Sequence, residues 1–459
     1  MPYAVLPPFI RWLSRRALRW LYRDVQFVGL EQVPASGATL LIGNHPNDLP
    51  DVLLGFFTTR RALRYVATIS ATSMPLASST YRGMGVIPVM RVRDVRKVRA
   101  MGVDVAAVNR EAAATFAAAV GAGDAIGVFP EGGVHDTSHV ARFQSGVAKM
   151  ALNSIDTDKF SDIKIVPLGI QYEAPRTLRS DVIVALGSPF SLRAWLAEQP
   201  DGSASALAER MRDALIPVTR NSSSWPNAEA RDRLVAAVAA VSANGTDALE
   251  RACLSVQGRC AKLVEGQDES QTGEHELVVH WRTIADPLAN TLRHAGGIET
   301  SARDMVRMLD AVGVGTPHAR WPSTAWVALA ALPAMVGLAL HAPLWRGIWA
   351  LSARLAEVRT DLMARAILPG LHLIFLAYLV FGGVAALGFR AAGLSMWWAA
   401  VVVVVLPRLG DLGMVWYDAV RALRLRARVH RWSAADRDAV RASAEHLRAA
   451  WMALPHTSP

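Results

Sequence analysis

Cysteine is almost absent from this chain: its 459 residues include only Cys253 and Cys260. Neither has a companion histidine at metal-ligand spacing, so the two thiols predict neither a zinc site nor a disulfide framework. We expect both to be ordinary helical core residues. No serine or cysteine arrangement typical of a covalent nucleophile stands out either. The sequence therefore implies no metal and no cofactor, and its chemistry needs no covalent intermediate on the enzyme.

Acidic charge is also in deficit, with 39 Asp and Glu against 49 Lys and Arg and a net charge of +10. Such a balance suits nucleic acid, anionic lipid or phosphate-bearing substrates. No zinc finger or RNA-binding motif is present, and 52% of the residues are hydrophobic. We therefore expect membrane lipids, and not nucleic acid, among the partners.

The first 24 residues lack the uninterrupted apolar core of a cleavable signal, because five arginines interrupt them. Trp12 and Trp20 stand among these arginines. The pattern predicts a basic amphipathic helix over residues 1–24 that lies in the headgroup region of a membrane. The alternative is a soluble helix packed on the next domain.

Strand-like and helix-like runs alternate between residues 25 and 195. This alternation predicts an α/β fold, a mixed sheet flanked by helices. The helical runs include 103–120 and 140–152. The expected strands are 25–28, 39–42, 64–67, 86–89, 125–129, 163–170 and 182–186.

A polar motif, Asn44-His45-Pro46-Asn47-Asp48-Leu49-Pro50-Asp51, follows the second expected strand and precedes an apolar helical run. It places His45 at the carboxyl end of a strand and Asp51 in the first turn of a helix. A carboxylate there can hold one imidazole nitrogen and leave the other free to accept a proton. Asp48 is a rival partner at shorter spacing. The alternative is a histidine in a polar turn, with Asp51 as a helix-start charge.

A second motif, Phe129-Pro130-Glu131-Gly132-Gly133, breaks the expected strand 125–129 sharply. Glycine-rich turns after such strands let backbone N–H groups face an anion. Active groups gather at the carboxyl ends of strands in open α/β sheets, and His45 and Glu131 both fall there. We therefore expect the two motifs to line the same cleft.

Together these motifs resemble sequence blocks of the glycerolipid acyltransferases, the family of glycerol-3-phosphate and lysophosphatidic acid acyltransferases. Residues 85–91 resemble the family's substrate-binding strand, and residues 165–170 resemble its fourth, proline-centred block. The resemblance covers roughly residues 25 to 195. It implies transfer of a fatty acyl group from acyl-CoA or acyl carrier protein to a hydroxyl of glycerol 3-phosphate or a lysophospholipid, in phospholipid biosynthesis. His45 would be the general base and Asp51 its orienting partner.

The chain departs from the family pattern at two points. Five residues separate His45 from Asp51 where most members have four, which resembles a subgroup of bacterial and fungal-type glycerol-3-phosphate acyltransferase-like proteins. The usual Glu-Gly-Thr-Arg-Ser is replaced by Glu-Gly-Gly-Val-His, so the arginine expected to hold a phosphate is missing. Glu131, Gly132 and Gly133 would shape the acceptor site. The remaining candidates for binding the acceptor are Arg91, His135, Arg142 and Lys149.

Two other functions stay open at this level. The acceptor could be a different, non-phosphorylated alcohol, or the chain could be a catalytically inactive lipid-binding scaffold. The intact His45 and Asp51 pair argues against the scaffold.

The remaining sequence is helical in pattern. Residues 196–320 carry no motif and predict a helical extension, in which His280, Trp281 and His294 are expected to be structural. Residues 321–410 form a hydrophobic membrane region, and 411–459 form basic C-terminal helices.

Three apolar runs occupy the hydrophobic region: 325–340, 366–389 and 394–406. Arginines flank the last two runs on both outer sides, whereas Arg390 alone lies between them. By the positive-inside rule both flanks are cytoplasmic, so 366–406 is expected to form a hairpin with Arg390 at its turn. The run 325–340 is then expected to bend at Pro333 or lie in the interface, with the catalytic domain facing the cytoplasm. The alternative is a set of buried soluble helices.

Overall fold

The computed structural model describes residues 6–68, 85–90, 104–133, 135, 137–155, 162–173, 179–222, 224–242, 288, 302–314, 321–355 and 362–453. The chain forms two compact units, residues 1–221 with 358–364, and residues 222–357 with 365–459. Arg91, both cysteines, His280, Trp281 and His294 lie outside the described residues.

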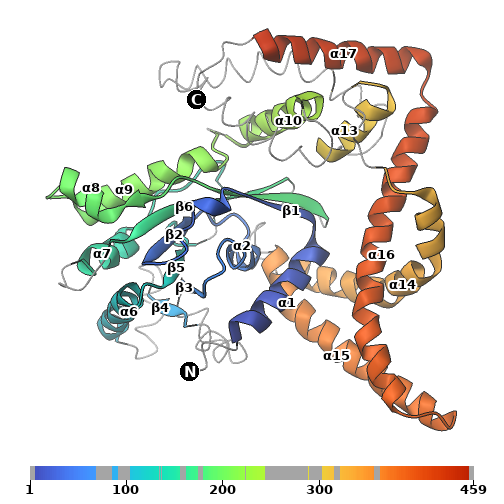
Figure 1. The fold of residues 1–459 in the computed structure, drawn as a ribbon, viewed down its shortest axis with the longest axis horizontal. Helices are drawn as coiled ribbons and strands as arrows, with labels where there is room; N and C mark the ends of the chain where they lie inside the picture. The colour runs from blue at the N-terminus through green and yellow to red at the C-terminus, as the bar shows by residue number, and fades with distance from the viewer. Residues whose placement is uncertain are drawn as a thin grey trace. The chain divides into compact units, whose positions relative to one another are not determined.

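The first unit is built on an eight-stranded mixed sheet (Figure 1). Its order is β1-β7-β6-β2-β5-β3-β4, and β8 pairs with β6. β6 runs antiparallel to β7 and β8, and the other pairs are parallel. The strands are β1 (Tyr22–Val28), β2 (Thr39–Gly43), β3 (Leu63–Thr68), β4 (Ile87–Val89), β5 (Ala125–Val128), β6 (Lys164–Tyr172), β7 (Ser180–Leu186) and β8 (Phe190–Ser191).

This topology confirms the predicted α/β fold and all seven expected strands. Four helices share one core with the strands: α6 (Val105–Gly121), α7 (Ser145–Asn153), α8 (Leu192–Glu198) and α9 (Ala204–Leu215). Leu40 and Ile42 of β2 lie in this core, and Leu41 between them points to the opposite face, as strand alternation requires. Because α8 and α9 belong to this core, the first unit extends beyond residue 195, the boundary expected from sequence.

Helix α7 begins five residues later than expected. The sequence predicted a helix from residue 140, whereas residues 140–144 are not helical and α7 starts at Ser145. The backbone N–H groups of Val140 and Ala141 donate to side chains of Asn221 and Glu131, at 2.8 and 3.1 Å. These contacts hold the segment before α7 in a non-helical path and place it beside Glu131.

The N-terminal helix α1 (Leu6–Leu21) ends directly at β1 and packs against α2 (Leu49–Gly55). Leu18, Trp20 and Leu21 are buried, and the Arg11 guanidinium donates to the carbonyl oxygens of Thr59 and Arg61. One face of α1 therefore packs on the sheet unit, as the alternative interpretation required. Trp12 is 58% exposed, which leaves a tryptophan for the predicted contact with headgroups.

The second unit holds a helical core and three long apolar helices. Residues of α10 (Trp225–Ser242), α13 (Ala302–Ala311) and α17 (Ala434–Ala453) are buried together in that core. The long helices are α14 (Thr324–Leu355), α15 (Leu362–Ala391) and α16 (Trp397–His430). Among the described residues, Thr324–Leu351 and Trp397–His430 are long and apolar enough to cross a membrane.

Helix α14 contains Pro333 within its length, and α16 continues through Pro407 past residue 410. The two helices pack closely: a Cβ on Gly337 would lie 2.0 Å from the carbonyl oxygen of Leu409, so only glycine allows this approach. The candidate span Thr324–Leu351 includes the run 325–340, and the bend of that run at Pro333 or its place in the interface stays a prediction.

The predicted hairpin corresponds to two consecutive helices, and its insertion in a membrane stays a prediction. α15 and α16 are joined by residues 392–396, and exposed Arg390 lies at the end of α15. A Cβ on Gly382 would lie 2.6 Å from Val403 Cγ2, so the two helices pack closely near the turn. Trp416 Nε1 donates to the Val327 carbonyl oxygen at 2.8 Å, which places the start of α14 beside the later part of α16.

This arrangement predicts a labelling pattern in intact cells. Ser323, Ser395 and Ser433 are exposed, and Ser→Cys changes little in volume. In a variant whose two native cysteines are replaced by serine, an impermeant thiol reagent added from outside should label Ser395→Cys. It should leave Ser323→Cys and Ser433→Cys unlabelled, because the positive-inside rule predicts that both lie on the cytoplasmic side. Labelling of either of these, or no labelling at residue 395, would contradict the topology.

Candidate active site

The site forms where β2 ends between its neighbours β5 and β6. Asn44, the first residue after β2, holds β6 through both atoms of its amide. Its Nδ2 donates to the Ile170 carbonyl oxygen at 3.0 Å, and its Oδ1 accepts from Ile170 N at 2.7 Å. The chain then turns away from the sheet, so His45 lies at the carboxyl edge of the parallel strands, where the sequence placed it.

The structure brings His45 and Asp51 together. His45 Nδ1 lies 2.9 Å from Asp51 Oδ2, and the Asp51 side chain is 0% exposed. Asp48, the rival partner, is 47% exposed, and its Oδ1 lies 3.8 Å from His45 Nε2, beyond hydrogen-bond distance. Asp51 therefore fixes Nδ1 and leaves Nε2 available for a substrate proton.

Asp51 accepts two further hydrogen bonds besides the one from His45. Asn47 N donates to Oδ2 at 2.8 Å, and Tyr172 Oη donates to Oδ1 at 2.5 Å. Tyr172 is the last residue of β6, two positions beyond the expected end of that strand. The sequence analysis missed Tyr172, because nothing local links it to a residue 121 positions earlier.

The surroundings shift the pKa of both partners. Burial by itself would lower the pKa of His45, but the hydrogen bond and charge of Asp51, with the charges of Asp48 and Glu131, outweigh it and raise that pKa above 6.5. Burial raises the pKa of Asp51, and its hydrogen bonds to His45, Tyr172 and Asn47 oppose that rise. A raised pKa makes His45 a stronger base than free imidazole.

An aromatic stack fixes the plane of the imidazole. The rings of His45 and Phe129 are 4.1 Å apart at 6°, and Tyr65 stacks on Phe129 at 5.8 Å and 11°. Glycines make room for both neighbours: a Cβ on Gly43 would lie 2.8 Å from Phe129, and one on Gly127 would lie 2.7 Å from Tyr65. The glycines of β2 and β5 therefore admit the rings that hold His45.

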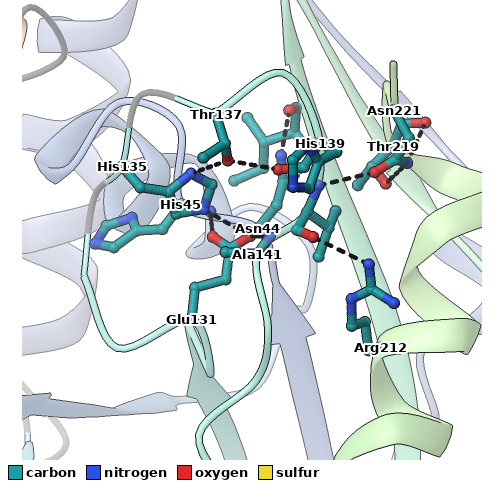
Figure 2. A network of polar contacts seen from close by, with 12 residues as sticks. Asn44, His45, Glu131, His135, Thr137, His139, Ala141, Arg212, Thr219 and Asn221 are labelled. Atoms are coloured by element: carbon teal, nitrogen blue, oxygen red, sulfur yellow. Dashed lines mark hydrogen bonds and ion pairs between the residues drawn. The ribbon is translucent and has the colours of Figure 1, made fainter. Parts of the chain in front are cut away.

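Glu131 joins the two motifs through backbone hydrogen bonds, as Figure 2 shows. Its Oε2 accepts from His45 N at 2.9 Å, and its Oε1 accepts from Ala141 N at 3.1 Å. Gly132 and Gly133 follow with φ of 77° and 153°, conformations that residues with a Cβ rarely adopt. The carboxylate thus positions the His45 backbone and holds the loop after β5 against it.

His135 lies on the far side of that carboxylate. Its Nε2 is 3.0 Å from Glu131 Oε1, an ion-pair distance without hydrogen-bond geometry, and its Nδ1 is 2.5 Å from Thr137 Oγ1. The outer part of the same loop is held by Asn221, which accepts from Val140 N (Figure 2). The structure therefore brings His45, Asp51, Glu131, Gly132, Gly133 and His135 into one site.

The predicted cations are not brought into this cluster. Arg142 is 85% exposed, with Nε 4.0 Å from Glu209 Oε1, and Lys149 is exposed on α7. Arg91 lies outside the described residues, so its role stays a prediction. In the part of the chain that the structure describes, no group of three or more His, Cys, Asp or Glu side chains is arranged to hold a metal ion.

Comparison with known proteins shows which proteins this chain is similar to. Residues 24–171 match the Acyltransferase family model. Over 67 residues the chain is 42% identical to glycerol-3-phosphate O-acyltransferase 1 of Saccharomyces cerevisiae, covering 15% of this chain and 9% of that protein. Over 100 residues it is 31% identical to glycerol-3-phosphate O-acyltransferase 2 of the same yeast, covering 21% and 14%.

The chain spans less than a sixth of the length of either yeast protein. The solved structure of a 1-acyl-sn-glycerophosphate acyltransferase from Thermotoga maritima is also similar, with a TM-score of 0.31 and 18% identity over 45% of this chain and 79% of that one. Residues 24–171 therefore form an acyltransferase domain, similar to that of the glycerolipid acyltransferases.

Proposed function

We propose that this protein is a membrane-associated O-acyltransferase that moves a fatty acyl group from a thioester to a hydroxyl of glycerol 3-phosphate or a lysophospholipid. The observation that carries the proposal is the buried hydrogen bond between His45 Nδ1 and Asp51 at the carboxyl edge of the sheet. It orients an imidazole whose other nitrogen is available as a base. The acyltransferase domain and the glycerol-3-phosphate acyltransferases among its relatives support the choice of reaction.

The mechanism needs one base and no covalent enzyme intermediate. His45 Nε2 takes the proton of the acceptor hydroxyl as the oxygen attacks the thioester carbonyl. The tetrahedral intermediate then forms the ester by breaking the carbon–sulfur bond, and the protonated imidazole returns its proton to the leaving thiol. Asp51 stabilises the imidazolium between these steps. Backbone N–H groups near Glu131 and Gly132 are our candidates for stabilising the oxyanion.

The acceptor phosphate needs a cation or several N–H donors. Arg91 follows the strand β4, which lies in the same sheet, and is our candidate for this role. Arg91→Ala is expected to raise the Michaelis constant for the acceptor far more than that for the thioester. Steady-state kinetics with each substrate varied in turn checks this. An effect confined to the thioester would assign Arg91 to the donor side and favour a non-phosphorylated acceptor.

The raised pKa of His45 predicts the pH dependence of the reaction. The free imidazole is the active form, so kcat/KM should fall as the pH decreases through a value above 6.5, the ordinary pKa of histidine. Asp51→Asn removes the carboxylate that raises this pKa. The acidic limb of the pH–rate profile, where kcat/KM falls with decreasing pH, should therefore move to lower pH. A pH–rate profile of both proteins with one donor measures this. A wild-type limb well below 6.5 would contradict it.

The decisive experiment is product identification. Purified full-length protein is incubated with acyl-CoA or acyl carrier protein and a panel of glycerol 3-phosphate, lysophospholipids and non-phosphorylated alcohols. Mass spectrometry identifies the ester, and release of free thiol gives the rate. We expect an acylated glycerol phosphate, formed by the wild type and not by His45→Ala. Release of thiol with no acceptor acylated would contradict the proposal and indicate thioester hydrolysis, whereas no reaction with any pair would favour the scaffold.

A further inference from the structure

Asp51 is held from behind by two buried tyrosines that come from distant strands. Tyr172 ends β6, Tyr22 begins β1, and their rings lie 5.4 Å apart. Both side chains are almost fully buried. Asn47, from the turn between β2 and α2, completes the group by donating from Nδ2 to Tyr22 Oη at 3.1 Å.

The polar contacts assign the hydrogen of Tyr172. Each phenol has one hydrogen to donate. The Tyr172 hydrogen points to Asp51 Oδ1, because a buried carboxylate is acceptor-only and lies 2.5 Å away. Tyr22 Oη accepts from Asn47, and the ring of Tyr22 packs against that of Tyr172. Tyr172 is therefore the donor to Asp51, and Tyr22 and Asn47 hold the Tyr172 ring in place.

A hydrogen bond to a charged group is strongest where water is excluded. Asp51 is fully buried, and no solvent reaches it to take over a lost hydrogen bond. Burial raises the pKa of both tyrosines above the ordinary value for a phenol, so they remain neutral donors across the working pH range. The carboxylate is thereby kept ionised and fixed in one orientation.

We infer that Tyr172 is a positioning residue for His45, acting through Asp51, and that Tyr22 and Asn47 reinforce it. The inference rests on the proposed role of His45 as the base. Tyr172 disperses part of the charge of Asp51, which limits how far that carboxylate raises the pKa of His45. Its hydroxyl contacts Asp51 Oδ1 whereas His45 contacts Oδ2, so it acts on His45 through the carboxylate.

The test is Tyr172→Phe in the full-length protein, which removes one hydroxyl and keeps the ring. We expect kcat to fall roughly tenfold, the size of one hydrogen bond to a charged group, with little change in the Michaelis constants. The acidic limb of the pH–rate profile should move to higher pH, opposite to the shift expected for Asp51→Asn. Tyr22→Phe should give a smaller shift in the same direction.

Tyr65→Phe is the matched control. Tyr65 is also fully buried, and its hydroxyl donates to the Val52 carbonyl oxygen at 3.0 Å instead of to Asp51. It should lower the melting temperature while leaving the acidic limb in place. If Tyr172→Phe also lowered stability without moving the limb, or moved it to lower pH, the inference would be overturned.

A readout independent of turnover separates this inference from the proposed reaction. NMR titration of ¹⁵N-labelled histidine, with the His45 signal assigned by its loss in His45→Ala, gives the pKa of His45 directly. A higher pKa in Tyr172→Phe supports the inference even if no acceptor is acylated, and an unchanged pKa overturns it. Full activity of His45→Ala would overturn the proposed function instead.

Discussion

His45→Ala is expected to lower kcat/KM by about 10²–10⁴-fold, the range for loss of a positioned general base. The fold should survive, because Asp51 keeps the hydrogen bonds from Asn47 N and Tyr172 when the imidazole is removed. Initial rates of thiol release measure the effect, and thermal melting checks the fold. His446→Ala, an exposed histidine on α17, is the matched control and should leave the rate unchanged.

The partner of His45 is tested with two isosteric variants. Asp51→Asn should lower kcat by roughly a hundredfold or more, because an amide no longer stabilises the imidazolium or enforces the tautomer that leaves Nε2 free. Asp48→Asn should be milder, because Asp48 lies 3.8 Å from Nε2 and is half-exposed. A large loss of kcat in Asp48→Asn, together with an unchanged kcat in Asp51→Asn, would show that the pairing in the structure is not the one used in catalysis.

Glu131→Gln is expected to be nearly as damaging as Glu131→Ala, with a loss in kcat/KM of roughly tenfold to a hundredfold. Both carboxylate oxygens accept from backbone N–H groups, those of His45 and Ala141. A glutamine amide offers one oxygen and turns an NH₂ group toward the other N–H, so one hydrogen bond is lost and replaced by repulsion. The position of the His45 backbone and of the following loop should loosen together.

Rates measured for Glu131→Gln, Glu131→Ala and Glu209→Gln check this prediction. Glu209 is exposed and lies 4.0 Å from Arg142, so its amide variant should be silent. Limited proteolysis of the segment 132–143 should accelerate in both Glu131 variants. Full activity of Glu131→Gln would show that one acceptor oxygen is sufficient and that the two-sided contact is dispensable.

Local sequence determined the central part of this site. His45 and Asp51 lie six positions apart, across one turn between a strand and a helix, so their meeting depends only on elements that the sequence specifies by itself. The seven expected strands were found for the same reason, since apolar runs bounded by turn residues indicate buried strands. The meeting of His45 with Glu131 required only that both follow parallel strands of one sheet.

Where an element begins at tertiary contacts, the sequence misled. The helix expected from residue 140 begins at Ser145, and the segment before it is held by Asn221 and Glu131, which accept from the N–H groups of Val140 and Ala141. These partners lie 81 and 10 positions away, so no short window of neighbouring residues shows them.

The sequence by itself therefore determined the base, its carboxylate and the edge of the sheet where they lie. Only the tertiary structure decided what holds them in place: the Phe129 and Tyr65 rings beside His45, and Tyr172 and Tyr22 behind Asp51. The physical reason is the sequence separation over which the deciding contacts act. A strand and its turn are set by neighbours along the chain, whereas a buried carboxylate takes its donors from whichever strands the register brings alongside it, and β6 brings Tyr172 from 121 residues away.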